Sequence, residues 1–289
     1  MEAESKVKQK FCQHRVLVNL YYYSDSSGNA AEYSMTLLSH AADVKIPGRL
    51  SDRICVSVYG KNISELKRNV KRAMSVDPGY IELRLDYIPA ILRRFVRLSE
   101  IDRPKNRIFT FRSYEEGGHS RISDESRIRI LLEIVSKLDP PIVDIEIETL
   151  RLFPEVSDLV FKRLSFPAKT DLIASSHNFQ KTEDRDGLED LVLGAVKKYS
   201  PRFVKVVRHA NEFSDNLVIL SLYKLRERIK PTELIAFCTG SLGVFSRIAC
   251  VSYGSPFTFA SLPGRETASG QLDVNDMKTL LDSWTVARN

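Results

Sequence analysis

The sequence predicts an α/β fold, a (β/α)8 TIM barrel with an N-terminal β-hairpin-containing extension. From residue 54 onward, eight short β-branched runs alternate with longer amphipathic segments over about 235 residues. Such alternation indicates parallel strands joined by helices, and eight units in this length suit a closed barrel. A doubly wound open sheet is the alternative, but the first strand leads into "VYGKNIS", which lacks the glycine-rich turn typical of that fold.

Residues 1–50 break this rhythm. "RVLVNLYYYSD" and "AEYSMTLLSH" flank "SSGNA", a pattern that predicts a hairpin, and "KIPGRLSDR" follows as a connector. The Tyr21–Tyr23 triplet suits strand surface packed on the barrel better than a ligand-stacking role. We therefore expect an extension over residues 1–50 and a catalytic barrel over residues 51–289.

The strands are expected where β-branched residues cluster, and the helices where apolar residues recur every three or four positions. Ser64 is a candidate N-cap for the first helix, which would place Leu66, Val70 and Met74 on one face. Asn275 and Asp276 mark the start of the last helix. The expected strands are 54–60, 80–86, 107–113, 142–148, 171–177, 202–207, 233–239 and, less clearly, 249–255; the expected helices are 64–74, 123–137, 187–199, 215–229 and 274–284.

The composition suits a globular protein with a sizeable core. The chain has 289 residues, of which 43% are hydrophobic and 28% charged. The net charge is +6, but basic residues are interspersed among 37 acids. The densest basic cluster, "ILRRFVRL" at 91–98, reads as a solvated helix face in preference to a nucleic-acid surface.

The sequence disfavours a membrane-spanning protein, a secreted protein and a zinc-binding protein. No apolar run reaches the roughly 18 residues of a membrane span, and the polar start "MEAESKVKQKF" has no signal-peptide core. The four cysteines form no CxxC pair, which is typical of reduced thiols in a cytoplasm and not of a zinc site. We expect a cytoplasmic protein that binds neither nucleic acid nor membrane.

Charged residues in the second strand point to a functional interior. Glu82, Arg84 and Asp86 alternate with apolar residues, so they share one strand face. The outer face of a barrel strand packs on helices, so these charges should point inward. Burying charges without a task is costly, although a purely structural ion-pair network is the plain alternative.

Further polar residues end other strands at the same edge. Arg112 closes the third strand and is followed by Glu116; His177 closes the fifth; Lys205 sits within "FVKVV" of the sixth. Barrel active sites are built at this edge. Taken alone, each of these residues could have a purely structural role. Lys205 alone could be a strand-end lysine whose amine reaches out to water. Their convergence is what favours a site.

Lysine, histidine and a carboxylate suit Schiff-base chemistry. Apolar walls or nearby cations lower the pKa of a lysine, so that more of it is a neutral nucleophile. The amine then forms an imine with a ketone, and the iminium acidifies the neighbouring C–H. A histidine can take that proton and return one to a leaving group. This chemistry needs neither metal nor cofactor.

With these residues in view, the sequence resembles the type I 3-dehydroquinate dehydratases, the Schiff-base dehydroquinases of the shikimate pathway of aromatic amino acid biosynthesis. The resemblance spans roughly residues 53–285 and agrees with the barrel. It rests on eight short motifs in family order, namely "VSVYGK", "IELRLD", "FTFRSYEEGG", "SSHNF", "FVKV", "GSLGVFSR", "GSPFTFA" and "ASGQLDVND".

The resemblance implies a role for each matching position. Lys205 would form the Schiff base, His177 would act as general base and acid, and Glu116 would support it. Arg247 would hold the substrate carboxylate. The remaining substrate contacts implied are Ser57, Glu82, Arg84, Arg112, Thr267 and Gln271. The family also implies 3-dehydroquinate as substrate, no cofactor and a homodimer.

The chain departs from the family pattern in places. Cys238 and Thr239 replace the usual serine and methionine, which puts an apolar wall of the site in question, and "ASGQ" replaces "APGQ" near the C-terminus. Two alternatives stay open: a non-catalytic barrel that binds quinate or dehydroquinate and regulates, and another Schiff-base lyase of the aldolase type. Retained Lys205, His177 and Glu116 disfavour the first, and Arg247 with Gln271 disfavours the second.

Overall fold

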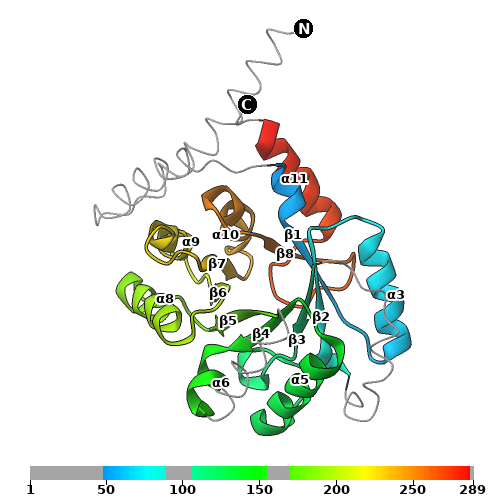
Figure 1. The fold of residues 1–289 in the computed structure, drawn as a ribbon. Helices are drawn as coiled ribbons and strands as arrows, with labels where there is room; N and C mark the ends of the chain where they lie inside the picture. Colours follow the sequence, from blue (N-terminus) through cyan, green and yellow to red (C-terminus); the bar gives the residue numbers. More distant parts are fainter. Residues whose placement is uncertain (1–47, 89–105, 155–169, 287–289) are drawn as a thin grey trace, which may run out of the picture.

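The computed structural model describes residues 48–88, 106–154 and 170–286. Eight parallel strands surround the centre of the molecule, and helices pack around them (Figure 1). The strands are β1 (Ile54–Val58), β2 (Tyr80–Arg84), β3 (Arg107–Thr110), β4 (Ile142–Glu146), β5 (Asp171–His177), β6 (Phe203–His209), β7 (Glu233–Thr239) and β8 (Thr258–Ser261).

From β2 to β7 each strand pairs with the one before it in the sequence, and β8 pairs with β1. Within the described ranges, β7 and β8 share no ladder, so the sheet forms a nearly closed (β/α)8 barrel. The predicted fold class is confirmed. The strands read as near-continuous apolar runs because helices cover their outer faces. The α-helices are α3 (Ile63–Met74), α5 (Asp124–Leu138), α6 (Ile147–Leu152), α8 (Arg185–Tyr199), α9 (Ser214–Ser221), α10 (Val244–Ala249) and α11 (Val274–Val286).

The strand register brings the polar inward residues to neighbouring heights. Ser57 lies opposite Glu82. Ser175 lies opposite Glu146 on one side and opposite Lys205 on the other. Because side chains alternate between the two faces of a strand, these residues share the barrel interior. Parallel pairing thus collects into one place side chains that lie far apart in the sequence.

The eighth strand was predicted in the wrong segment. Of residues 249–255, Ala249 ends α10 and the next four form the 3-10 helix η6 (Cys250–Tyr253), and β8 follows at Thr258–Ser261. The chain leaves β7 at the top of the barrel and must return to the bottom before β8 can run parallel to it, which requires a helical connection. Gly254, with φ +105°, ends that connection.

Other boundaries differ for local reasons. The N-cap of α3 is Asn62 and not Ser64, because the Asn62 side chain accepts the backbone N–H of Glu65. Met74 is 41% exposed and does not join the buried face. The helix predicted over 215–229 stops at Ser221 and continues as the 3-10 helix η5 (Leu222–Leu225). The hydroxyl of Tyr223 donates to the carbonyl of Ala236 and accepts its N–H, which fixes this turn against β7.

Two helices escaped prediction. The run 142–148 is a strand only as far as Glu146, and α6 begins at Ile147. α10 occupies part of the motif "GSLGVFSR". The predicted hairpin in residues 1–50 and the basic cluster 91–98 lie outside the described residues. None of the helices in the described ranges is long and apolar enough to cross a membrane.

Candidate active site

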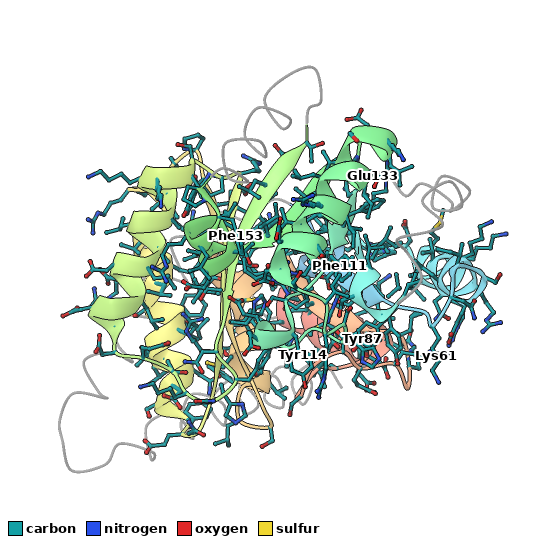
Figure 2. All side chains as sticks on the ribbon, turned by 90° about the horizontal axis from the view of Figure 1, so that it is seen from below. Lys61, Tyr87, Phe111, Tyr114, Glu133 and Phe153 are labelled. Atoms are coloured by element: carbon teal, nitrogen blue, oxygen red, sulfur yellow. The ribbon has the colours of Figure 1, made fainter. Side chains whose placement is uncertain are left out.

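One cavity opens at the carboxyl ends of the strands. Figure 2 shows Lys61, Tyr87 and Tyr114, which follow β1, β2 and β3, along one edge of the molecule, with Glu133 toward the opposite edge. All ten residues selected from the sequence line this cavity: Ser57, Glu82, Arg84, Arg112, Glu116, His177, Lys205, Arg247, Thr267 and Gln271.

Lys205 projects from the middle of β6 into the cavity. It is 4% exposed, and its Nζ donates to Asp144 Oδ2 at 3.2 Å and lies 4.0 Å from Glu82 Oε1. The ring of Phe259 lies under it, with 4.1 Å from Nζ to the ring centroid. The sequence led us to expect apolar walls or cations around this amine. The apolar wall is present, but the nearest charges are carboxylates, which hold the amine in one position.

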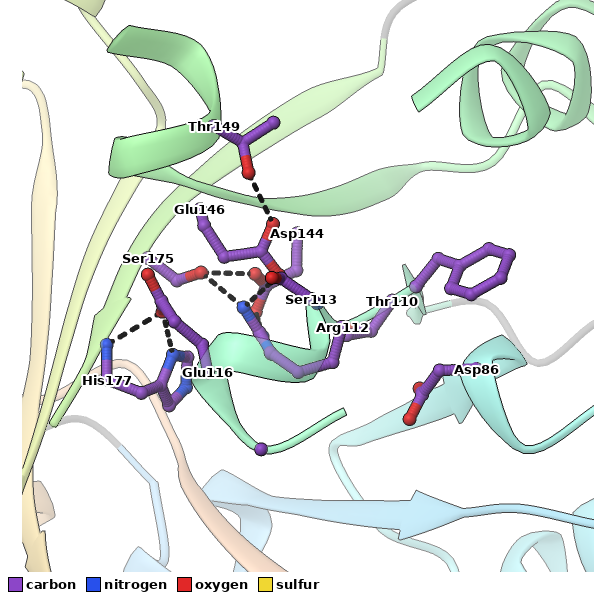
Figure 3. A network of polar contacts seen from close by, with 12 residues as sticks. Asp86, Thr110, Arg112, Ser113, Glu116, Asp144, Glu146, Thr149, Ser175 and His177 are labelled. Atoms are coloured by element: carbon purple, nitrogen blue, oxygen red, sulfur yellow. Dashed lines mark hydrogen bonds and ion pairs between the residues drawn. The ribbon is translucent and has the colours of Figure 1, made fainter. Parts of the chain in front are cut away.

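Buried ion pairs surround the base of the cavity (Figure 3). Arg112 contacts Asp144 Oδ2 at 2.7 Å and Glu146 Oε1 at 2.9 Å. Asp144 also accepts the hydroxyl of Ser175 at 2.6 Å. Burial opposes the charge of Asp144, but Arg112 and Lys205 outweigh it and hold the pKa of this carboxyl well below its usual value. Asp144 is therefore ionised between two cations.

His177 and Glu116 form the pair next to Lys205. Glu116 Oε2 accepts the backbone N–H of His177 at 2.8 Å and also lies 2.8 Å from its ring Nδ1, a contact that suits the tautomer with the proton on Nδ1. Burial, followed by the negative charge of Glu146, raises the pKa of Glu116 to about 8. Burial, with the positive charges of Arg112 and Lys205, lowers the pKa of His177 well below its usual value. The imidazole is therefore neutral at pH 7, and Nε2 is left for the cavity.

Glu82 and Arg84 of β2 are held by different partners. Glu82 accepts the hydroxyl of Ser57 at 2.6 Å and that of Thr110 at 2.8 Å. Arg84 makes a two-pronged contact with Asp86, at 2.9 Å and 2.8 Å. Burial opposes the charge of Arg84, but Asp86 outweighs it and raises the pKa of the guanidinium. These side chains enter the cavity with fixed orientations.

Arg247 of α10 is a buried cation that has no carboxylate partner in the part of the chain that the structure describes. It is 1% exposed, and its Nε and Nη2 have no hydrogen-bond partner among the described residues. Its guanidinium carbon lies 4.6 Å from the ring centroid of Phe237. Burial lowers its pKa to about 10, so it still carries its charge at pH 7. An unpaired buried guanidinium that lines a cavity is suited to an anionic ligand.

The loop of residues 262–273, between β8 and α11, supplies one side of the cavity. Gln271 Oε1 accepts the backbone N–H of Thr267 at 2.7 Å and its hydroxyl at 3.0 Å. Gly240 donates its N–H to the carbonyl of Ser269 at 3.2 Å. A Cβ on Gly270 would lie 2.2 Å from the carbonyl oxygen of Gly240, so only glycine allows this approach.

The positions that depart from the family pattern are also resolved. Thr239 lines the cavity, and its hydroxyl donates to the carbonyl of Arg208 at 3.0 Å. The hydroxyl is thus satisfied by the backbone. Cys238 is buried on the other face of β7, where its N–H donates to Ser246 Oγ. The cysteine that stands here in place of the usual serine therefore leaves the cavity wall unchanged.

Sequence reasoning missed Asp144, Glu146 and the ring of Phe259. Asp144 and Glu146 alternate with apolar residues in "IVDIEIE", the same signal that identified Glu82 and Arg84 in β2. That signal could have found them. Phe259 gave no signal, because an aromatic residue in a strand is ordinary.

The arrangement defines the chemistry that the cavity can support. A fixed amine stands beside a neutral imidazole, and a free guanidinium can hold an anion. This set suits imine formation on a carbonyl and transfer of a proton next to it, on a substrate with an acidic group.

Comparisons with known proteins agree with this chemistry. Residues 54–287 match the family model described as type I 3-dehydroquinase. The 3-dehydroquinate dehydratase of Thermococcus onnurineus is 34% identical over 226 residues, which cover 78% of this chain and 95% of that protein. That of Methanothermobacter thermautotrophicus is 31% identical over 234 residues, covering 80% and 97%. The crystal structure of 3-dehydroquinate dehydratase from Geobacillus kaustophilus has a TM-score of 0.72 at 25% identity, covering 83% of this chain and 92% of that one.

Proposed function

The chain belongs to the type I 3-dehydroquinase family, and we propose that the cavity at the carboxyl ends of its strands is the active site. The protein is a hydro-lyase that eliminates water from 3-dehydroquinate to give 3-dehydroshikimate through a lysine Schiff base. The observation that supports the residue assignment is the meeting of Lys205, the His177–Glu116 pair and the unpaired Arg247 in one cavity.

Lys205 is proposed to form the Schiff base. Its Nζ, once neutral, attacks the C3 ketone of the substrate, and the resulting carbinolamine loses water to leave an iminium. Asp144 and Glu82 stand within 4.0 Å of Nζ, so their negative charges can stabilise the iminium. The iminium then acts as the electron sink for the next step.

His177 is proposed to move both protons. Nε2 takes a proton from C2, and the C–H electron pair moves into the iminium to give an enamine. The enamine then expels the C1 hydroxyl, which leaves as water with the proton that His177 carries. Hydrolysis of the conjugated iminium frees Lys205 and the product. The water used in hydrolysis balances the water lost on imine formation, so the net loss is one water.

The other residues are proposed to bind the substrate. Arg247 pairs with the carboxylate at C1 by a charge-assisted contact. Glu82 and Arg84 meet ring hydroxyls with orientations already fixed by their partners. Ser57, Arg112, Thr267 and Gln271 complete the contacts, and Arg112 does so while it holds Asp144 and Glu146 in place.

The test is turnover of 3-dehydroquinate, followed by the absorbance of the conjugated product, together with borohydride trapping. Borohydride with substrate should add mass to the wild type on the peptide that contains Lys205, and Lys205→Ala should show neither adduct nor turnover. Labelling of another lysine would overturn the assignment. Binding of the substrate without turnover or adduct would favour the non-catalytic barrel.

We further propose that residues 1–50 form an extension that lies apart from catalysis, while residues 51–289 form the catalytic barrel. The protein is proposed to act in the cytoplasm as a homodimer, with no nucleic-acid partner, as in the family it belongs to. Deletion of residues 1–45 should lower stability or solubility more than kcat, and light scattering should give the mass of two chains. Selective loss of turnover in a folded truncation would place the extension at the site.

A further inference from the structure

The cavity wall formed by the loop 262–273 is tied by Arg265 to the neighbouring rim, where β1, the strand paired with β8, leads into α3. Arg265 Nη2 lies 2.7 Å from Oε1 of Glu65, which sits in the first turn of α3. The guanidinium carbon of Arg265 also lies 5.3 Å from the ring centroid of Tyr59, the residue that follows β1. Arg265 is only two residues from Thr267. The first part of the loop is therefore fastened to the β1–α3 side of the barrel.

Glu65 is held in position to receive this contact. Its other oxygen, Oε2, accepts the backbone N–H of Lys61 at 2.9 Å, and its own N–H donates to the N-cap Asn62. The side chains of Arg265 and Glu65 are 26% and 14% exposed. The pKa of Glu65 is lowered, first by the N–H of Lys61 and then by Arg265, so Glu65 carries its charge at neutral pH. The acceptor is thus a fixed, partly buried anion.

Tyr59 is the end of a stack that leads to the cavity. Its ring lies 4.3 Å from that of Tyr87, and the Tyr87 ring lies 4.7 Å from that of His119 in parallel planes. The guanidinium of Arg84 lies 5.2 Å from the centroid of Tyr87. Asp86 accepts both Arg84 and the backbone N–H of His119. Arg265 therefore rests on a stack whose far end, His119, is bonded to Asp86, and Asp86 in turn holds the cavity residue Arg84.

We propose that Arg265 is a positioning residue that holds the loop 262–273 over the cavity and so places Thr267 and Gln271 against the bound substrate. This inference rests on the proposed function of those two residues. The second half of the loop has its own contacts, from Gly240 to Ser269 and from Ser261 to the carbonyl of Leu272. Loss of the Arg265 contact should therefore release only the first half, and the fold should remain.

The kinetic test is Arg265→Ala compared with Arg129→Ala. Arg129 pairs with Glu125 on the outside of α5, where the two side chains are 76% and 59% exposed, so it is a matched ion pair away from the cavity. We expect Arg265→Ala to raise KM for 3-dehydroquinate by about three- to tenfold, the combined size of a partly exposed ion pair and a cation–π contact, with kcat nearly unchanged. Arg129→Ala should change neither.

The charge exchange Glu65→Arg with Arg265→Glu tests the pair itself. Each single change should raise KM, and the double variant should recover part of the loss because the attraction is restored across the same gap. Equal and additive losses would mean that the two residues act separately, and the proposal would be wrong. Unchanged KM in Arg265→Ala would also overturn it, while borohydride labelling of Lys205 would still support the proposed function.

Limited proteolysis gives a readout that does not depend on activity. Trypsin cleaves after Arg265, and Glu65→Gln leaves that arginine in place together with an acceptor for the N–H of Lys61. We expect cleavage between residues 265 and 266 to become faster in Glu65→Gln, while cleavage after Arg129 keeps its wild-type rate. Faster cleavage at both sites would indicate general destabilisation, and equal rates at residue 265 in wild type and variant would contradict the proposal.

Discussion

Glu116 Oε2 contacts His177 twice, because it accepts the backbone N–H of His177 and lies against the ring Nδ1, both at 2.8 Å. The backbone contact fixes the carboxylate relative to the end of β5, and the ring contact then fixes the imidazole relative to the carboxylate. The position of Nε2 is therefore fixed by two contacts. This geometry, present without substrate, is the one that the proposed roles of base and orienting group require.

From this relationship we expect His177→Ala and Glu116→Gln to differ in kind. Removal of the imidazole should leave imine formation on Lys205 possible but stop elimination, with a loss of roughly 10²–10⁴-fold in kcat. The substrate adduct should then accumulate and be visible by mass spectrometry without borohydride. Glu116→Gln keeps a hydrogen-bonding group and should be milder. A more severe effect of Glu116→Gln would mean that the carboxylate, and not the imidazole, transfers the proton.

The same pair predicts how stability depends on pH. Glu116 has a folded pKa of about 8, above its usual value, so its contribution to stability is full below its unfolded pKa of about 4.3 and is lost as pH rises to 8. His177 has a lowered folded pKa, so its contribution is full above its unfolded pKa of about 6.5 and is lost as pH falls. Between about pH 6.5 and 8, Glu116 is thus the member of the pair that titrates.

Stability of the wild type should therefore fall between pH 6.5 and 8 by at most roughly 2 kcal/mol through this group. The side chain in Glu116→Gln cannot ionise. Between pH 6.5 and 8 the free energy of unfolding of this variant should therefore fall less than that of the wild type, and the difference should equal the contribution of Glu116. Urea unfolding at the two pH values measures the difference for both proteins. Parallel pH dependences would show that Glu116 already carries its charge at pH 6.5.

Much of the site could be predicted from the sequence because buried charges are costly. Lys205 within "FVKVV" and Glu82 with Arg84 in "IELRLD" stand out against apolar neighbours. Parallel strands in a barrel then place such residues at one end. The eighth strand was misplaced because Val251 and Tyr253 suit a strand as well as a helical turn, and β8 itself has only four residues. Local propensity could not decide between them.

What the sequence could not give is which charges meet. Lys205 and Asp144 are 61 positions apart, and Arg265 and Glu65 are 200 apart. Their contacts depend on strand register and on the path of a loop, neither of which is written in a local pattern. The sequence also does not predict that Arg247 lacks a carboxylate partner among the described residues. An arginine in "GVFSR" gives the same local pattern whether or not a carboxylate lies beside it.

Asp144 offers a test of the charge arrangement at the base of the cavity. Asp144→Asn keeps the shape of the side chain but removes the negative charge shared by Arg112 and Lys205. Two buried cations would then face one amide, so we expect stability to fall by about 3 kcal/mol and the wild-type geometry of Lys205 to be lost. Chemical unfolding and borohydride labelling measure the two effects. Unchanged stability would mean that Glu146 and Glu82 compensate the cations without Asp144.

Arg247 and Arg127 form a matched pair for the last prediction. Each is 1% exposed, but Arg127 contacts Glu146, Thr149 and the carbonyl of Phe111, whereas Nε and Nη2 of Arg247 have no partner among the described residues. Removing a buried charge with partners is strongly destabilising, by about 3–5 kcal/mol, so Arg127→Met should lower the free energy of unfolding by that amount.

Arg247→Met should do the opposite in the absence of substrate. It removes unsatisfied polar atoms, which burial already disfavours, as the lowering of the Arg247 pKa to about 10 indicates. We therefore expect its stability to equal or exceed that of the wild type, while KM for 3-dehydroquinate rises by the equivalent of about 2–5 kcal/mol because the substrate carboxylate loses its partner. Urea unfolding and initial rates on both variants separate the two outcomes. A marked loss of stability in Arg247→Met would mean that this guanidinium already holds the fold together, and its assignment to the carboxylate would fail.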